Sequence, residues 1–182
     1  MSPVDDQVAV TWHQQCQDWF AAHPDLKEGA EVGVWVGSLS RRLLDIGVQS
    51  LLLVDPWRVV LELTDHGPRI WGPGYSDDEM EAAFQSVWDW SKTESRVKVI
   101  RMESLRAARY VNRYSLDFVI LDARHDYAAV KDDIEAWLPK IKCGGYLVGD
   151  DYTAHFPGVG QAVQEVFGER AVVASPMWWV QV

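Results

Sequence analysis

Five short apolar runs, separated by helical patterns, constrain the fold of this chain more than any other feature of its sequence. The runs cover residues 31–36, 51–54, 97–102, 116–121 and 145–149. Each is four to six residues long and lacks a helical period. Such runs are typical of strands that are buried on both faces of a parallel sheet.

Helical patterns fill the intervals between these runs, and one more precedes them. Val8, Trp12, Cys16 and Phe20 recur at helical spacing, which predicts an N-terminal helix within residues 1–26 that caps the active site. Strand–helix alternation favours right-handed βαβ units, and therefore an α/β fold with a Rossmann-like, doubly wound sheet. The remaining helical patterns cover residues 38–46, 77–92, 127–141 and 159–167.

The end of the chain departs from a simple parallel sheet. Residues 171–174 and 177–182 are β-like runs with no room for a helix between them, so they should pair antiparallel. Together with the five runs above, they predict seven strands that finish in an antiparallel C-terminal hairpin strand. Residues 58–76, rich in Gly and Pro, are predicted to form an insertion loop within a single domain spanning 1–182.

Charge and composition disfavour several kinds of partner. The net charge is −10, whereas nucleic acids and anionic membrane surfaces attract basic proteins. The sequence contains no apolar run of about 18 residues, which a membrane span requires. Cys16 and Cys143 form neither a disulfide pattern nor a zinc pattern, and polar residues follow Met1. A cytoplasmic location is therefore expected, and the choice between a monomer and a homodimer stays open.

A predicted strand that leads through a glycine turn into a helix is the first candidate site. Glu31, Gly33, Gly37 and Ser38 form this turn, where backbone can approach a ligand and a helix N-terminus offers free N–H groups. Asp55 ends the next strand and could accept hydrogen bonds from a ribose diol. The alternatives are a turn without a ligand and an Asp that caps a helix or faces solvent. The combination fits both a nicotinamide cofactor and S-adenosylmethionine.

The third strand leads to a second candidate. Glu103 and Ser104 follow the run 97–102, at a position that faces the adenine side of the cleft in sheets of this kind. The alternative is that Ser104 caps the helix that follows it. Both roles can hold at once.

Three carboxylates follow the last two strands of the parallel series. Asp122 comes after the run 116–121, and Asp150 and Asp151 come after the run 145–149. Ligands of open α/β sheets bind beyond these strand ends. Converging carboxylates need a compensating cation or proton, and oxygen ligands suit Mg²⁺, Ca²⁺ or Mn²⁺. The alternative is that one or two of the three cap helices or face solvent.

One histidine accompanies these carboxylates. His125 lies three residues after Asp122, and an imidazole with an ordinary pKa near 6.5 suits a general base. The alternative is a packing or capping role. His155 is a weaker candidate because it follows the second strand end, and the remaining histidines, including His13, have no comparable context.

Taken together, these motifs resemble class I S-adenosylmethionine-dependent methyltransferases over residues 27–182. The most specific stretch is 104–152, with its strand 116–122, His125-Asp126-Tyr127, the helix containing Asp133-Ile134 and Trp137-Leu138-Pro139, the turn 143–145 and Gly149-Asp150-Asp151-Tyr152. It is similar to small bacterial methyltransferases encoded beside sugar and natural-product genes. The C-terminal hairpin also matches this family better than it matches the nicotinamide dehydrogenases.

The resemblance implies roles for the candidate residues. Glu31, Gly33 and Gly37 would hold the methionine part of the cofactor, and Asp55 its ribose. Glu103 and Ser104 would lie beside its adenine.

A narrower similarity is to metal-dependent O-methyltransferases of the macrocin and catechol types. By that similarity, Asp122, Asp150 and Asp151 would hold Mg²⁺. His125 occupies the place of the basic residue that deprotonates the acceptor in the catechol type.

The sequence as a whole therefore predicts methyl transfer from S-adenosylmethionine to an oxygen of a small molecule such as a phenol, a sugar or a natural product. Asp122 and His125 are the predicted catalytic residues. The competing hypotheses are a nicotinamide-dependent oxidoreductase and a non-catalytic module that binds a cofactor or a partner.

Overall fold

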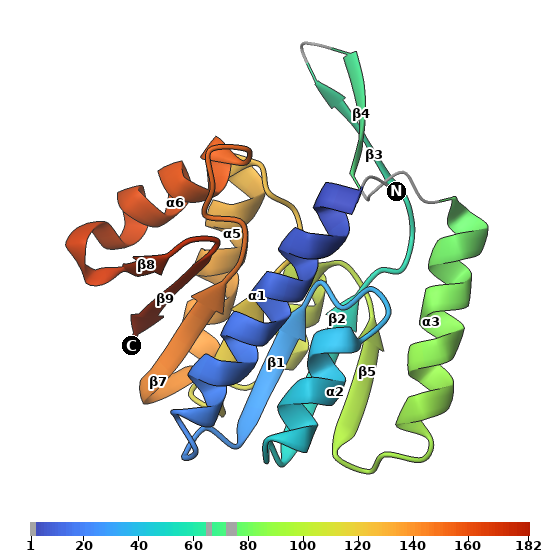
Figure 1. The fold of residues 1–182 in the computed structure, drawn as a ribbon, viewed down its shortest axis with the longest axis vertical. Helices are drawn as coiled ribbons and strands as arrows, with labels where there is room; N and C mark the ends of the chain where they lie inside the picture. The colour runs from blue at the N-terminus through green and yellow to red at the C-terminus, as the bar shows by residue number, and fades with distance from the viewer. Residues whose placement is uncertain (1–2, 65–66, 72–75) are drawn as a thin grey trace.

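A mixed sheet forms the centre of the molecule. The computed structural model describes residues 3–64, 67–71 and 76–182, and within them seven strands form one sheet in the order β5-β2-β1-β6-β7-β9-β8 (Figure 1). Five strands are parallel, and β9 is antiparallel to both β7 and β8. The predicted Rossmann-like α/β sheet with its antiparallel C-terminal strand is confirmed. The strands are β1 (Glu28–Val32), β2 (Ser50–Asp55), β5 (Val97–Arg101), β6 (Leu116–Leu121), β7 (Ile141–Gly149), β8 (Val172–Ala174) and β9 (Met177–Gln181).

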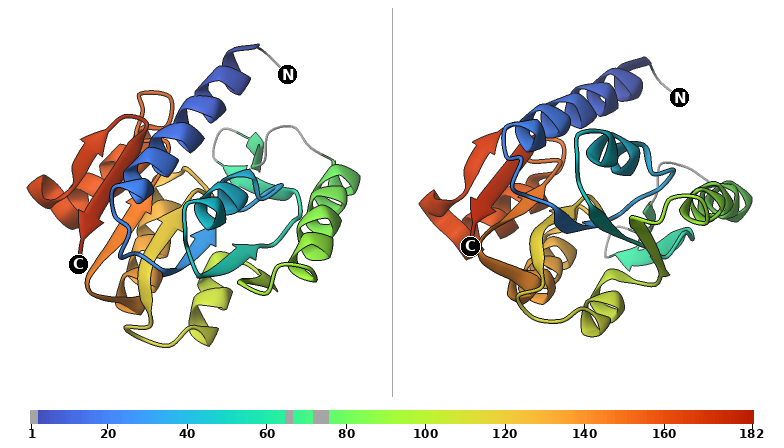
Figure 2. Two further views of the ribbon diagram at one scale, coloured as in Figure 1. Left: turned by 60° about the horizontal axis from the view of Figure 1, so that its bottom comes forward. Right: turned by 90° about the horizontal axis from the view of Figure 1, so that it is seen from below.

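Helices cover both faces of this sheet (Figure 2). α1 (Pro3–Ala21), α2 (Ser38–Asp45) and α3 (Asp77–Ser91) contribute to one apolar core. A second core, on the opposite face, includes residues of α4 (Ser104–Ala107), α5 (Tyr127–Trp137) and α6 (Pro157–Phe167). Among the described helices, none is both long enough and apolar enough to cross a membrane. Three short 3₁₀ turns complete the helical structure: Ala108–Tyr110, Leu138–Lys140 and Gly168–Arg170.

Two predicted strands have different bounds in the structure. The first strand was expected at 31–36, but β1 ends at Val32 because Gly33, with a φ of 90°, turns the chain away from the sheet. The apolar residues at 34–36 therefore belong to the turn. The last parallel strand was expected at 145–149, but β7 already begins at Ile141, directly after the 3₁₀ turn that contains Pro139.

The predicted insertion contains regular structure that the sequence analysis missed. Within 58–76, β3 (Val60–Thr64) pairs antiparallel with β4 (Gly67–Trp71) to form a two-stranded hairpin. In Figure 1 this hairpin projects from the sheet, beyond the carboxyl ends of the parallel strands. Residues 65–66 and 72–75 of the predicted loop lie outside the described residues.

Gly33 should tolerate no side chain, because its φ is 90° and an added Cβ would lie 1.8 Å from the Asp122 carbonyl oxygen. Gly33→Ala should lower the free energy of unfolding by more than about 3 kcal/mol, through both strain and overlap. Gly144→Ala is the matched control, because Gly144 has a φ of 84° and no atom within 4 Å of the added Cβ. That variant should lose only about 1 kcal/mol. Equal losses in urea unfolding would show that Gly33 is required for its φ alone.

Candidate active site

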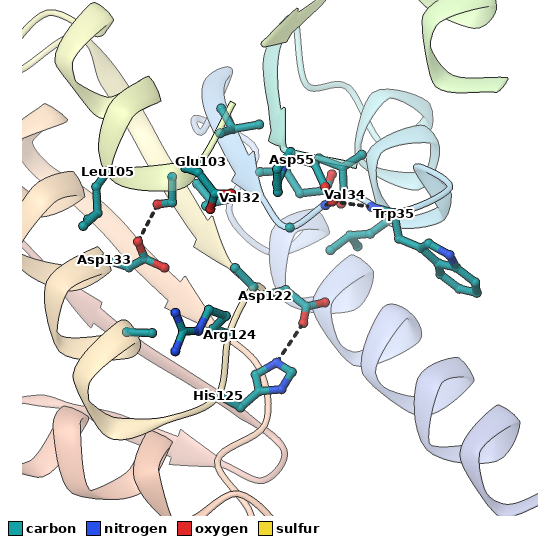
Figure 3. Close-up of a pocket in the computed structure, with 18 of the residues that line it drawn as sticks. Val32, Val34, Trp35, Asp55, Glu103, Leu105, Asp122, Arg124, His125 and Asp133 are labelled. Carbon is teal, nitrogen blue, oxygen red and sulfur yellow. Dashed lines mark hydrogen bonds and ion pairs between the residues drawn. The ribbon is translucent and has the colours of Figure 1, made fainter. Parts of the chain in front are cut away.

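A single pocket brings most of the predicted site residues together. It has a volume of about 740 Å³ and lies beyond the carboxyl ends of β1, β2, β5 and β6 (Figure 3). Gly37, Asp150 and Asp151 are not among the residues that line it. The predicted residues that do line it are Glu31, Gly33, Ser38, Asp55, Glu103, Ser104, Asp122 and His125.

Asp55 organises the glycine turn through its carboxylate. Its Oδ2 accepts hydrogen bonds from the backbone N–H groups of Val34 and Trp35, at 2.9 and 3.0 Å. Its Oδ1 accepts one from the N–H of Trp57 at 2.6 Å. Trp35 and Trp57 have positive φ values of 50° and 45°, which are unfavourable for such residues and therefore need support of this kind. Asp55 thus shapes the pocket while its carboxylate also lines it.

Glu31 is a buried acid in the lining of the pocket. It is 2% exposed, and the Ser40 hydroxyl donates a hydrogen bond of 2.6 Å to its Oε2. Burial raises the pKa of Glu31 from 4.5 to about 8, because desolvation outweighs the Ser40 hydrogen bond and the nearby Asp122 and Asp55 add like charge. Glu31 therefore favours the protonated form at neutral pH unless a cation lies beside it.

Gly37 places the helix that follows the turn. It occupies the N-cap position of α2 with a φ of 71° and provides no side-chain cap. The first helical residue, Ser38, lines the pocket. The N-terminus of α2 therefore lies at the pocket, as the sequence pattern indicated.

The residues predicted beside adenine are already engaged with neighbouring side chains. Nε of Arg58 donates a hydrogen bond of 3.0 Å to Glu103. The Ser104 hydroxyl donates a short hydrogen bond to Asp133 and accepts one of 2.8 Å from Nε1 of Trp137. Burial raises the pKa of Asp133 to about 6.

Asp133 and Trp137 were not predicted as site residues, although Asp133 lines the pocket. An acid on the buried face of an amphipathic helix was the signal that could have identified Asp133, since such groups require partners.

The sequence predicted that Asp122, Asp150 and Asp151 would bind a metal ion, but the structure groups Asp122 and Asp151 with His125 instead. Nε2 of His125 lies 3.0 Å from Oδ2 of Asp151 and 3.7 Å from Oδ1 of Asp122. One candidate ligand atom from each of these three residues lies within 4.8 Å of the others. Asp150 is outside this group. Its Oδ1 is buried without a hydrogen-bond partner among the described residues, and burial with the charges of Asp122 and Asp151 raises its pKa to about 9.

His125 balances the charge of this cluster in the ligand-free protein. Burial alone would lower its pKa, but Asp122 and Asp151 outweigh burial and raise it from 6.5 to about 10. A protonated ring cannot accept another proton, so these carboxylates oppose the predicted base role of His125. The same three donors also fit a divalent cation. The imidazole makes the set less specific for Mg²⁺ than three carboxylates would be.

Helix α1 contributes residues that the sequence analysis did not place in the site. Nε1 of Trp12 donates a hydrogen bond of 3.2 Å to Oδ2 of Asp122, and the adjacent His13 lines the pocket. His155, the weaker histidine candidate, is exposed and packs edge-on against Phe156 instead of lining the pocket. Periodicity identified α1, but it could not show which residues of the helix face the strand ends.

Comparison with known proteins agrees with this geometry. The sequence model of a methyltransferase domain family matches residues 13–152. No curated protein matches the chain.

Several solved structures share the fold at low sequence identity. The O-methyltransferase NovP is 17% identical, with 95% of this chain and 78% of that chain covered and a TM-score of 0.63. CalS11, a calicheamicin methyltransferase, is 16% identical, with 94% and 79% covered and a TM-score of 0.65. The N-methyltransferase NodS from Bradyrhizobium japonicum is 13% identical, with 96% and 95% covered and a TM-score of 0.59.

The family match includes the glycine turn, the strand ends and the pocket that they form. The similarity to the solved methyltransferases extends over more than nine tenths of the chain, which includes the antiparallel strand β9 or its neighbours in the sheet. The chain therefore belongs to the methyltransferase domain family and has the fold of a class I S-adenosylmethionine-dependent methyltransferase.

Proposed function

We propose that this protein transfers the methyl group of S-adenosylmethionine to an oxygen of a small molecule. The observation that carries the proposal is the composition of one pocket. A glycine turn and Asp55 lie in its wall, and Asp122 and His125 lie in another part of the same wall. A pocket of about 740 Å³ lies within the range of small-molecule sites. Donor and acceptor can therefore meet in one enclosure, where positioning supplies much of the rate enhancement.

The walls near β1, β2 and β5 suit the donor. Glu31 and Asp55 provide negative charge and acceptors at the turn, which complement a cationic methionine portion and a ribose. Leu105 and Ser104 line the pocket beyond β5, where an adenine ring would find an apolar contact and an amide backbone. In this arrangement Gly33 and Gly37 contribute by allowing the backbone conformation of the turn.

The strand ends of β6 and β7 suit the acceptor. Asp122, His125 and Asp151 lie beside the donor walls and offer polar groups that can orient a hydroxyl. NovP is an O-methyltransferase, and CalS11 is also described as a TDP-rhamnose 3′-O-methyltransferase. The similarity to these two proteins supports an oxygen acceptor and, through CalS11, a sugar or a natural product. A phenol stays among the acceptors to be tested.

A divalent cation is part of the proposal for the acceptor side. Asp122, His125 and Asp151 would hold it. The buried Oδ1 of Asp150, which has no hydrogen-bond partner in the described part of the chain, would gain from a nearby positive charge. Such an ion lowers the pKa of a hydroxyl that it binds. The chain's own contribution is to fix the three donors on the ends of two adjacent strands.

The competing functions are less well supported. A nicotinamide-dependent oxidoreductase is disfavoured by the antiparallel β9 and by the family match. A non-catalytic module is disfavoured because it has no need of a pocket in which Asp122 and His125 lie beside the glycine turn.

S-adenosylhomocysteine should stabilise the protein, whereas NAD should not. At 100 times its dissociation constant, a ligand of the folded state adds about 2.7 kcal/mol to the free energy of unfolding. Thermal unfolding with each ligand measures this effect, and Asp55→Asn should reduce it because the turn loses its carboxylate. A shift with NAD alone would contradict the proposal. The absence of a shift with either ligand would favour the non-catalytic module.

Mn²⁺ should bind to the ligand-free protein at one site. Asp151→Asn should abolish the calorimetric signal, because it removes one of three grouped donors. Asp45→Asn is the control, since Asp45 is an exposed acid at the end of α2. A screen with labelled methyl donor can identify a phenol or sugar that the protein methylates. A chelator should then lower the rate of methyl transfer to that acceptor. If Mn²⁺ binding is undetectable and a chelator leaves turnover unchanged, the cation proposal is wrong. Protonated His125 would then be sufficient to balance the charge of Asp122 and Asp151.

The free energy of unfolding should fall as pH rises from about 5 to about 8. Glu31 has a pKa of about 8 in the folded protein against an ordinary 4.5, so the folded state retains a proton that the unfolded chain releases. One such group accounts for up to about 1.4 kcal/mol per pH unit in this interval. Glu31→Gln should lower the slope by this amount in urea unfolding, while Asp150, whose pKa also rises to about 9, keeps its own contribution. Glu135→Gln, at an exposed position on α5, should leave the slope unchanged. Parallel curves for wild type and Glu31→Gln would contradict the assignment.

A further inference from the structure

Helix α1 is fixed directly to the acceptor side of the pocket. Cys16 and Phe20 anchor the helix in the core, and α1 packs against α2 and β9. Closer to its N-terminus, the buried Trp12 donates its indole N–H to Asp122 at the end of β6. The next residue, His13, lines the pocket. Figures 1 and 2 show α1 lying across the sheet, with its first turns beyond the carboxyl ends of the strands.

The His13 ring differs from the other histidine rings in its surroundings. It is half-buried and lines the pocket, and within the described part of the chain no hydrogen bond or ion pair engages it. By contrast, Nε2 of His125 faces two carboxylates. Nδ1 of His23 bonds to the Trp19 carbonyl, and His155 does not line the pocket. His13 is thus the pocket histidine whose ring nitrogens are available to a ligand.

Two charged groups act on His13 from the elements packed around it. Asp122, at the end of β6, raises the pKa of His13, and Arg42, on α2, lowers it. Burial is the largest effect, and the pKa lies below the ordinary 6.5 as a result. The ring is therefore neutral at pH 7 and has a lone pair to offer.

We propose that His13 is the general base that accepts the proton of the acceptor hydroxyl. This inference rests on the proposed function, because it takes the pocket beside Asp122 as the acceptor site. A base must lie within hydrogen-bond reach of the proton that it removes, and α1 places His13 in the same pocket wall as Asp122. The assignment replaces His125, because Asp122 and Asp151 beside its Nε2 favour the protonated ring, which cannot accept a proton.

The proton and electron pairs balance without a further reactant. The O–H bond of the acceptor breaks, and its proton goes to a ring nitrogen of His13. An oxygen lone pair forms the new O–CH₃ bond, while the S–CH₃ bond of S-adenosylmethionine breaks and leaves its electron pair on sulfur. The positive charge of the sulfonium thus ends on His13, which returns the proton to water after product release.

His13→Gln tests this role against a purely structural one. Calorimetry with S-adenosylhomocysteine comes first: wild type and variant should bind with equal affinity, and a wild type that does not bind would disprove the proposed function instead. With a phenol or sugar accepted by the wild type, the variant should lose at least about 100-fold in kcat. Gln14→Ala, at the adjacent exposed position of α1, should retain the wild-type rate.

The pH profile distinguishes a base from a packing residue. The wild-type kcat/KM should fall as His13 becomes protonated below pH 6.5, and His13→Gln should lose this dependence. If His13→Gln retains kcat within about threefold and keeps the wild-type pH dependence, His13 is not the base and the proposal is overturned.

A second measurement does not depend on finding the acceptor. The imidazole proton resonances of His13, assigned by their loss in His13→Gln, should titrate with a midpoint below 6.5 in the ligand-free protein. A midpoint above 7 would overturn the proposal, because the ring would then be largely protonated at neutral pH.

Discussion

The backbone of Gly33 lies against the carbonyl of Asp122, and the shape of the pocket depends on this contact. The Gly33 N–H donates to the carbonyl of Val54, and the Asp122 N–H donates to the carbonyl of Val32. These bonds join the ends of β1, β2 and β6, so the turn, Asp55 and Asp122 keep fixed positions relative to one another. Any Cβ at position 33 would separate the strand ends. The glycine is therefore required by packing between strands as well as by ligand access.

The same convergence brings acids together, and their mutual repulsion has to be compensated. Protons compensate it at Glu31 and Asp150, whose pKa values rise to about 8 and about 9. The imidazolium of His125 compensates it between Asp122 and Asp151. A cationic donor or a divalent ion can replace these protons, so ligand binding and proton release are coupled in such a pocket. The ligand-free pocket therefore favours the binding of positively charged ligands.

The parallel strands could be predicted from their apolar runs, as in β2, where four apolar residues lie between Ser50 and Asp55. The end of the first strand was predicted wrongly, because Val34-Trp35-Val36 is apolar although it belongs to the turn whose backbone N–H groups donate to Asp55. Asp122 and Asp151 were expected to meet because they follow adjacent strands. Asp150 was placed with them, although the pleat directs successive side chains to opposite sides. Trp12 and His13 were missed because the rotation of α1 over the strand ends is fixed by tertiary packing, which periodicity does not encode.

The two halves of the pocket differ in how they are built. Under the proposed function, the donor would lie against strand ends and their turns, which the fold itself positions. The acceptor would also face α1, and the β3–β4 hairpin projects on the same side of the sheet (Figure 1). O- and N-methyltransferases with 13–17% identity to this chain share its fold, so the fold alone does not set the acceptor. Acceptor choice in this protein should accordingly be sought in α1 and the hairpin, and donor binding in the strand ends.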